Sequence, residues 1–212
     1  MGNVFYYIKS DYKAALFLAI NNLRRLFFLN TSSLYMRWKL KTMGVKLGRN
    51  IKWGGNAQVE RFPMSKIIIG NRCVFNSKSI FNQRGIKKCI IQTGKIGAAI
   101  KIGDDCSFSG ISIVADSEVL IGNNVMVGAD SLIGDRDGHA DRLHTHTAKI
   151  IIEDNVFIGM HCMVLKGVTI GKNSIIGAGS IVTKDIPSNV VAVGVPCKVI
   201  RKIDDSVDCN KI

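Results

Sequence analysis

Three of the four histidines in this 212-residue chain lie in one short polar segment, residues 134–149. The segment reads GDRDGHADRLHTHTAK and contains His139, His144 and His146. A histidine with a pKa near neutrality is the usual general base for removing a proton from a hydroxyl or an amine. His139 is the best candidate, because Asp135 and Asp137 precede it in a tight polar turn, and a carboxylate or backbone carbonyl could fix its tautomer. The residue types alone favour a solvated surface turn equally well.

The same histidines are also compatible with a metal site. His139 and His144 are five residues apart, and His146 would add a third nitrogen, which is one ligand set of a catalytic Zn²⁺ with an open position. Spacing on an irregular loop does not bring three nitrogens together, however. We therefore expect no metal and keep a zinc site as the alternative.

A six-residue repeat surrounds this segment and must position it. An aliphatic residue recurs at every sixth position, and these residues are Ile152, Ile158, Val164, Ile170, Ile176 and Val182. The fifth position of each unit is small or aliphatic, as in Val156, Cys162, Val168, Ser174 and Ser180. A sustained period of six is typical of a β-helix, in which three units form a coil and stacked coils share one core. The repeat begins loosely at Val45 and breaks at about 134–151, so we expect a loop there that leaves the rod.

Composition and charge limit the other possibilities. The formal net charge is +13, and about +9 of it lies in residues 1–52, which suggests an anionic partner for that part. No nucleic-acid-binding motif accompanies this charge, so we expect no nucleic-acid partner. The six cysteines form no CxxC motif or disulfide framework. Cys162 is a conceivable nucleophile, but its place in the small inward slot favours packing.

The N-terminal residues 1–43 are predicted to be helical. Tyr12, Leu16, Ala19 and Leu23 form one apolar face, and aromatic residues alternate with Lys and Arg. The apolar run 14–20 is too short to span a bilayer. Such a helix suits either a membrane interface or a surface of the rod or of a neighbouring subunit, and packing is the more frequent outcome.

The block 151–201 resembles the C-terminal half of the hexapeptide-repeat acyltransferases. It contains VFIGMHCMVLKGVTIGKNSIIGAGSIVTKDIPSNVVAVGVPCKVIRKI, and the preceding IGNNVMVGADSLIGDRDGH is similar to their approach to the catalytic histidine. This family includes maltose and galactoside O-acetyltransferases and the acyltransferases of capsule and lipopolysaccharide loci. The resemblance implies an all-β fold, a left-handed parallel β-helix. It also implies a homotrimer with active sites between adjacent rods, and acetyl-CoA as the acyl donor.

On this basis the chain divides into three parts. We expect a helical, basic and aromatic extension over 1–44, a β-helix acyltransferase domain over 45–203, and a polar tail over 204–212. The long basic, aromatic extension differs from the short helical cap of the sugar enzymes.

The resemblance also implies roles for particular residues. His139 matches the family's catalytic histidine, and Asp116 matches an acid that binds the acceptor. Six residues match positions that bind coenzyme A, and these are Met160, Ala178, Thr183, Lys184, Lys198 and Arg201. The first two would contact the CoA arm through their backbone, the middle pair its end, and the last two its phosphates. The regular coils are expected to place Met160, Ala178 and Lys184 along one track.

Two departures concern the acceptor. Phe108, flanked by Ser107 and Ser109, stands where the sugar enzymes usually have Asn, and Phe157 stands where Trp is common. We therefore expect an acetyl-CoA-dependent O-acetyltransferase acting on a saccharide of a surface polysaccharide, a capsule or lipopolysaccharide, rather than on a free small sugar.

Four alternatives remain open from the sequence. They are an amino-sugar N-acetyltransferase, a serine acetyltransferase, a zinc hydratase of the γ-carbonic-anhydrase type, and a membrane-bound scaffold without catalysis. The expected location is the cytoplasm, with peripheral contact to the inner face of the membrane through residues 1–43 as a further option.

Overall fold

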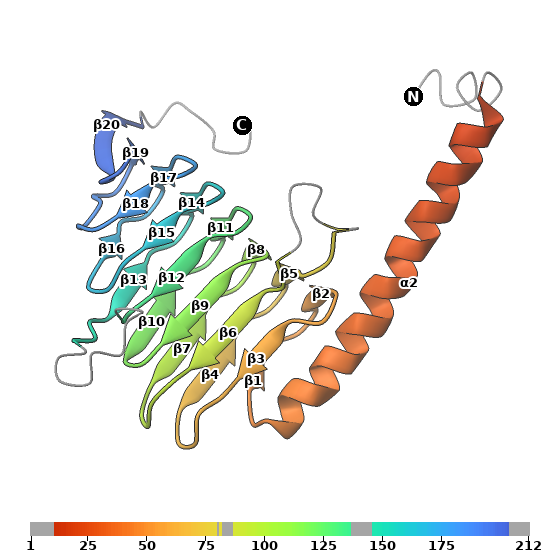
Figure 1. The fold of residues 1–212 in the computed structure, drawn as a ribbon, viewed down its shortest axis with the longest axis horizontal. Helices are drawn as coiled ribbons and strands as arrows, with labels where there is room; N and C mark the ends of the chain where they lie inside the picture. The colour runs from red at the N-terminus through yellow and green to blue at the C-terminus, as the bar shows by residue number, and fades with distance from the viewer. Residues whose placement is uncertain (1–10, 80, 82–86, 137–145, 204–212) are drawn as a thin grey trace.

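The computed structural model describes residues 11–79, 81, 87–136 and 146–203. His139 and His144 lie outside these residues, and so does the predicted tail 204–212. The described residues form a three-sided rod of short strands, which are parallel except in the last pair, and one long helix leaves the rod at its N-terminal end (Figure 1).

Each side of the rod is one sheet, and the chain visits the three sheets in turn. Sheet A contains β1 (Lys46–Leu47), β4 (Lys66–Ile69), β7 (Ala99–Ile102), β10 (Glu118–Ile121), β13 (Ile150–Ile152) and β16 (Thr169–Ile170). Sheet B contains β2 (Lys52–Gly54), β5 (Val74–Asn76), β8 (Ser107–Ser109), β11 (Met126–Val127), β14 (Phe157–Ile158), β17 (Ile175–Ile176), β19 (Val190–Val193) and β20 (Lys198–Lys202). Sheet C contains β3 (Gln58–Glu60), β6 (Ile90–Thr93), β9 (Ser112–Ala115), β12 (Leu132–Gly134), β15 (Met163–Val164) and β18 (Ile181–Val182). Three strands therefore make one coil, as the repeat predicts, and the predicted parallel β-helix is confirmed.

The corner between sheets A and B explains the recurring Ile-Gly-x-Asn pattern. A Cβ on Gly70 would lie 2.5 Å from the carbonyl carbon of Gly103 in the next coil, so only glycine permits this spacing. The Asn residues of the last coils have left-handed φ values of 53–59°, which asparagine tolerates. Their side chains form a ladder of hydrogen bonds with lengths of 2.9, 3.0 and 2.8 Å, through Asn124, Asn155, Asn173 and Asn189. Asparagine therefore suits this corner for two reasons: it tolerates the left-handed backbone, and its side chain bonds to the next coil.

The core fills the inside of the rod with the aliphatic residues of the repeat. In the first three coils it is aromatic: the Trp53 and Phe75 rings stack with centroids 4.3 Å apart, and Phe75 and Phe108 with centroids 5.0 Å apart. Phe108 is fully buried and belongs to this stack. Cys162 is also fully buried, its thiol donates to the Gly177 carbonyl at 3.2 Å, and burial raises its pKa. The prediction that Cys162 packs in the core is confirmed.

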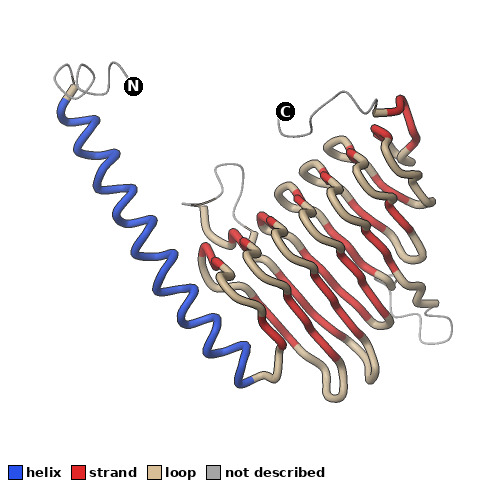
Figure 2. Tube along the Cα trace, turned by 180° about the vertical axis from the view of Figure 1, so that it is seen from behind, coloured by secondary structure: helices blue, strands red, loops and turns tan. Residues whose placement is uncertain are grey.

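Helix α2 (Tyr12–Thr42) contacts the rod through its C-terminal half, where Lys78 Nζ of the rod lies 4.5 Å from the centroid of the Phe28 ring. Met36 and Leu40 are fully buried, and the backbone N–H of Trp53 donates to the Ser33 hydroxyl at 2.9 Å. The Ser32 hydroxyl donates to the Trp53 carbonyl. Towards Tyr12 the helix diverges from the rod (Figures 1 and 2). Among the described residues, no helix is long and apolar enough to cross a membrane.

Candidate active site at a corner of the rod

The histidine segment replaces one turn between sheet C and sheet A. It follows β12 and precedes β13, and the grey trace in Figure 1 marks the part that is not described. The N–H of Ala148 donates to the carbonyl of Asp135 at 3.2 Å, so the insertion leaves and rejoins the rod at one point. The predicted loop at about 134–151 is thereby located at this corner.

Asp135 anchors the base of the insertion. Its side chain is fully buried, and its two carboxylate oxygens accept the backbone N–H groups of Asp116 and Ser117, each at 2.7 Å. Burial raises the pKa of Asp135, and the bonds from these N–H groups oppose that shift. The carboxylate therefore joins the insertion to the corner of the preceding coil. Sequence reasoning missed this role, although an Asp at the point where the repeat breaks was an available signal.

Asp116 lies directly beside this anchor. Its side chain is only 6% exposed and lies between Lys95 Nζ at 3.7 Å and Arg136 Nη1 at 3.4 Å. A Cβ on Gly94 would lie 2.1 Å from its Oδ1 atom, so glycine is required at that position. Two cations therefore face this carboxylate at the base of the histidine insertion.

A cavity of about 430 Å³ opens at the same corner. It is lined by Ile96, Gly97, Ala98, Ala99, Asp116, Ser117, Glu118 and Thr147. Thr147 belongs to the returning end of the histidine segment, and Asp116 is the predicted acceptor-binding acid. The corner thus combines a carboxylate, a hollow and the chain that carries His139.

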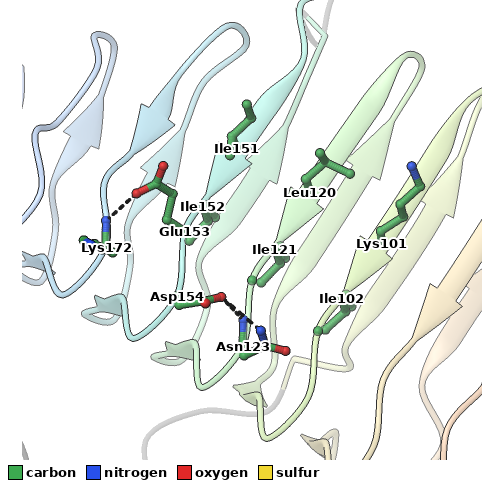
Figure 3. A pocket seen from close by; sticks show the side chains of 12 residues that line it. Lys101, Ile102, Leu120, Ile121, Asn123, Ile151, Ile152, Glu153, Asp154 and Lys172 are labelled. Carbon is green, nitrogen blue, oxygen red and sulfur yellow. Dashed lines mark hydrogen bonds between the residues drawn. The ribbon is translucent and has the colours of Figure 1, made fainter.

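A larger groove of about 760 Å³ runs over sheet A and the neighbouring A/B corner (Figure 3). Its acidic side chains already bond to adjacent coils: Glu153 accepts the Lys172 N–H at 2.8 Å, and Asp154 accepts the Asn123 N–H at 2.6 Å. These groups hold the coils together, so this groove is the weaker candidate for chemistry.

The predicted coenzyme A residues lie at two different corners of one rod. Met160 and Ala178 are neighbours at the corner between sheets B and C, where the Gly179 N–H donates to the Met160 carbonyl at 2.8 Å. Lys198 begins β20 at the same end of sheet B, paired with Val193, and Arg201 lies further along that strand. All of the basic side chains in the predicted set are exposed.

Thr183 and Lys184 follow β18 and lie at the corner between sheets C and A, with Asp116 and the histidine segment. The expectation of a single track through Met160, Ala178 and Lys184 is therefore wrong within one protomer. Each hexapeptide forms one side of a coil. Met160 and Ala178 therefore lie at one edge of sheet C, and Thr183 and Lys184 lie at the other edge.

The fixed corner at Asp135 leads to a stability prediction. Replacement of Asp135 by alanine leaves two buried N–H groups without their acceptor, at about 1–3 kcal/mol each. We expect the free energy of unfolding to fall by about 2–4 kcal/mol, measured by urea unfolding followed by circular dichroism. Asp185→Ala is the control, because Asp185 is exposed and accepts only one N–H, from Thr169 at 2.7 Å. Equal losses in both variants would contradict the anchoring role.

Comparison with known sequences supports the predicted resemblance. Residues 149–184 match the family described as "Bacterial transferase hexapeptide (six repeats)". The galactoside O-acetyltransferase of Lactococcus lactis subsp. lactis is 49% identical over 102 residues, which are 45% of this chain and 49% of that protein. The Escherichia coli galactoside O-acetyltransferase is 51% identical over 100 residues, with the same shares. The chain spans about half the length of the curated relatives it matches. The match over residues 149–184 agrees with the predicted resemblance to hexapeptide-repeat transferases.

Solved structures agree on the fold. A galactoside acetyltransferase in complex with coenzyme A is 29% identical with a TM-score of 0.51, over 89% of this chain and 83% of that one. AntD, an N-acyltransferase from Bacillus cereus solved with dTDP and 3-hydroxybutyryl-CoA, is 18% identical with a TM-score of 0.63, over 79% and 88%. The left-handed parallel β-helix is confirmed by these likenesses.

Proposed function

We propose that this chain is an acetyl-CoA-dependent O-acetyltransferase that transfers an acyl group to a hydroxyl of a saccharide. The observation that carries the proposal is the corner at Asp135, where the histidine insertion leaves the rod beside a charged Asp116 and a cavity. The identity of about half to galactoside O-acetyltransferases over some 100 residues supports the same chemistry.

The reaction is a direct transfer between two bound substrates. His139 removes the proton of the acceptor hydroxyl while that oxygen attacks the thioester carbonyl carbon. The new C–O bond forms, the C–S bond breaks, and the CoA thiolate receives the proton from the imidazolium. Asp116 accepts a hydrogen bond from the acceptor and holds it in line, because such a transfer depends on placing both reactants together.

A homotrimer would reunite the two sets of predicted residues. Asp116, Thr183 and Lys184 lie at one corner, and Met160 and Ala178 lie at the next corner of the same rod. If adjacent rods meet with these unlike corners facing, one cleft contains the base from one protomer and the CoA arm contacts from its neighbour. Lys198 and Arg201 then meet the phosphates as exposed cations.

The acceptor we propose is a saccharide of a surface polysaccharide under construction. Phe108, at the position where the sugar enzymes usually carry Asn, is buried in the aromatic stack and is not available to an acceptor. Its neighbours Ser107 and Ser109 belong to the same strand and are partly exposed. The surface offered to the sugar therefore differs from that of the enzymes for free galactosides.

A thioester-consumption screen with acetyl-CoA tests this function. We expect turnover with nucleotide- or lipid-linked sugars and little with free galactosides, amines or serine. Preference for an amino sugar or for serine would replace the O-acetyltransferase assignment. No consumption by any acceptor, together with near-stoichiometric zinc in the purified protein, would favour the hydratase.

Asp116 offers a test of acceptor binding. Asp116→Asn removes the charge that would accept the acceptor's hydrogen bond, and such a bond is worth about 1.5–3 kcal/mol. We expect the KM for the acceptor to rise at least about tenfold, with the KM for acetyl-CoA unchanged. Glu118→Gln, which lines the same cavity, is the matched control. An unchanged acceptor KM in Asp116→Asn would refute the role.

A further inference from the structure

Helix α2 exposes an unusual amount of apolar surface. Nine of its large side chains are more than half exposed, namely Tyr12, Leu16, Phe17, Leu18, Leu23, Leu26, Phe27, Leu34 and Trp38. Most of them lie in the half of the helix that diverges from the rod (Figure 2). Exposed apolar surface of this extent marks an interaction site.

The apolar stripe and the rod contact lie on opposite faces of the helix. At about 100° per residue, Leu16, Leu23, Phe27, Leu34 and Trp38 fall within one narrow sector. The two residues that pack on the rod, Met36 and Leu40, point the other way. A partner on the stripe would therefore meet the helix without displacing the rod.

The charge of the helix indicates what that partner is. The helix carries six basic residues, and no acidic residue lies between Tyr12 and Thr42. At about 100° per residue, Lys13, Arg24 and Arg37 flank the stripe. Pairing with the same helix of a second copy would bring basic side chains together without acidic partners, whereas helix pairs usually match opposite charges. The partner therefore has an anionic surface over an apolar interior. A bilayer that contains acidic phospholipids has both properties.

We propose that α2 binds the surface of an anionic phospholipid bilayer, with its apolar stripe at the headgroup boundary and its Lys and Arg side chains among the headgroups. Trp38 and Tyr12 are of the type that favours this interfacial depth. Combined with the proposed function, this would bring the rod to the membrane where lipid-linked saccharides lie. The binding of α2 to vesicles does not depend on that function.

Vesicle flotation with the full chain tests the proposal. We expect binding to phosphatidylcholine vesicles that contain phosphatidylglycerol, and much weaker binding to phosphatidylcholine alone or at high salt. The triple variant Leu16→Asn, Leu23→Asn, Phe27→Asn loses three apolar side chains from the stripe, and its partition coefficient should fall by about a hundredfold. Arg24→Gln with Arg37→Gln, which removes two exposed cations flanking the stripe, should lower the partition coefficient on anionic vesicles by roughly thirtyfold. Met64→Asn, a change at a residue 75% exposed on the rod, is the control and should bind normally.

Three outcomes would overturn the proposal. The first is a wild-type chain that does not bind anionic vesicles, and the second is a triple variant that binds as well as the wild type. The third is a drop in the solution mass of the triple variant, measured by light scattering, which would show that the stripe packs on another copy. Acetyl-CoA consumption with a water-soluble acceptor should be equal in wild type and triple variant, so a failure of the proposed function is seen separately.

Discussion

Replacing His139 by alanine is expected to lower turnover by about 10²–10⁴-fold, the contribution of a positioned general base. The base acts only in the chemical step, so acetyl-CoA binding and the assembly state should persist. Turnover is measured by steady-state kinetics with the acceptor that the screen identifies. Binding of CoA is measured by calorimetric titration. The structure supports the site through the buried Asp135 and the charged Asp116 at the base of the insertion.

Two further histidines make the test specific. His161 is exposed at a different corner and has a left-handed φ of 56°, so His161→Asn preserves its backbone and should keep wild-type turnover. His144→Ala separates base from metal chemistry, because a zinc site would lose its metal in that variant and in His139→Ala alike. Wild-type turnover in His139→Ala would remove His139 from the mechanism.

Replacing Phe108 by alanine should lower the free energy of unfolding by about 3–5 kcal/mol, the usual cost of removing a buried phenylalanine. Phe108 is the last ring of the Trp53–Phe75–Phe108 stack and is fully buried. Coils of a rod contact only their neighbours, so a cavity in the third coil also weakens the link between the first coils and the rest.

Guanidinium unfolding followed by both circular dichroism and tryptophan fluorescence checks this result. Trp53 lies in the first coil and Trp38 on the helix that packs against it, so fluorescence reports on that end of the rod. The two signals should therefore separate in the variant if the link is broken. Met126→Ala is the control, because Met126 lies on the next strand of sheet B and is 46% exposed. A loss below about 1 kcal/mol in Phe108→Ala would mean that the stack does not join the coils.

The repeat could be predicted from the sequence because one physical requirement recurs in every coil. Ile158, Ile170 and Ile176 must each face the core, and the structure buries all three fully. Strands are harder to predict where the sequence does not keep this core-facing residue at every sixth position. The connection between β5 and β6 is longer than the other B/C corners, so the six-residue period is not kept there.

The site was less predictable for a related reason. A linear repeat shows that Met160 and Lys184 follow core residues, but the corner each occupies depends on counting units around the rod. The Asp135 anchor bonds across coils, between residues 18 and 19 positions apart, and no local pattern reveals it. The direction of α2 depends on Met36, Leu40 and the Ser32 and Ser33 hydroxyls, whereas the sequence showed only that the helix has an apolar face.

The closed base of the histidine insertion also bears on how such a protein can change. Ala148 and Asp135 are joined by a hydrogen bond, so the ends of the insertion stay together whatever chain lies between them. Doubling the length of a flexible loop costs only about 0.6 kcal/mol, far less than disturbing a coil. The insertion can therefore change in length and sequence while the rod beneath it keeps its stability.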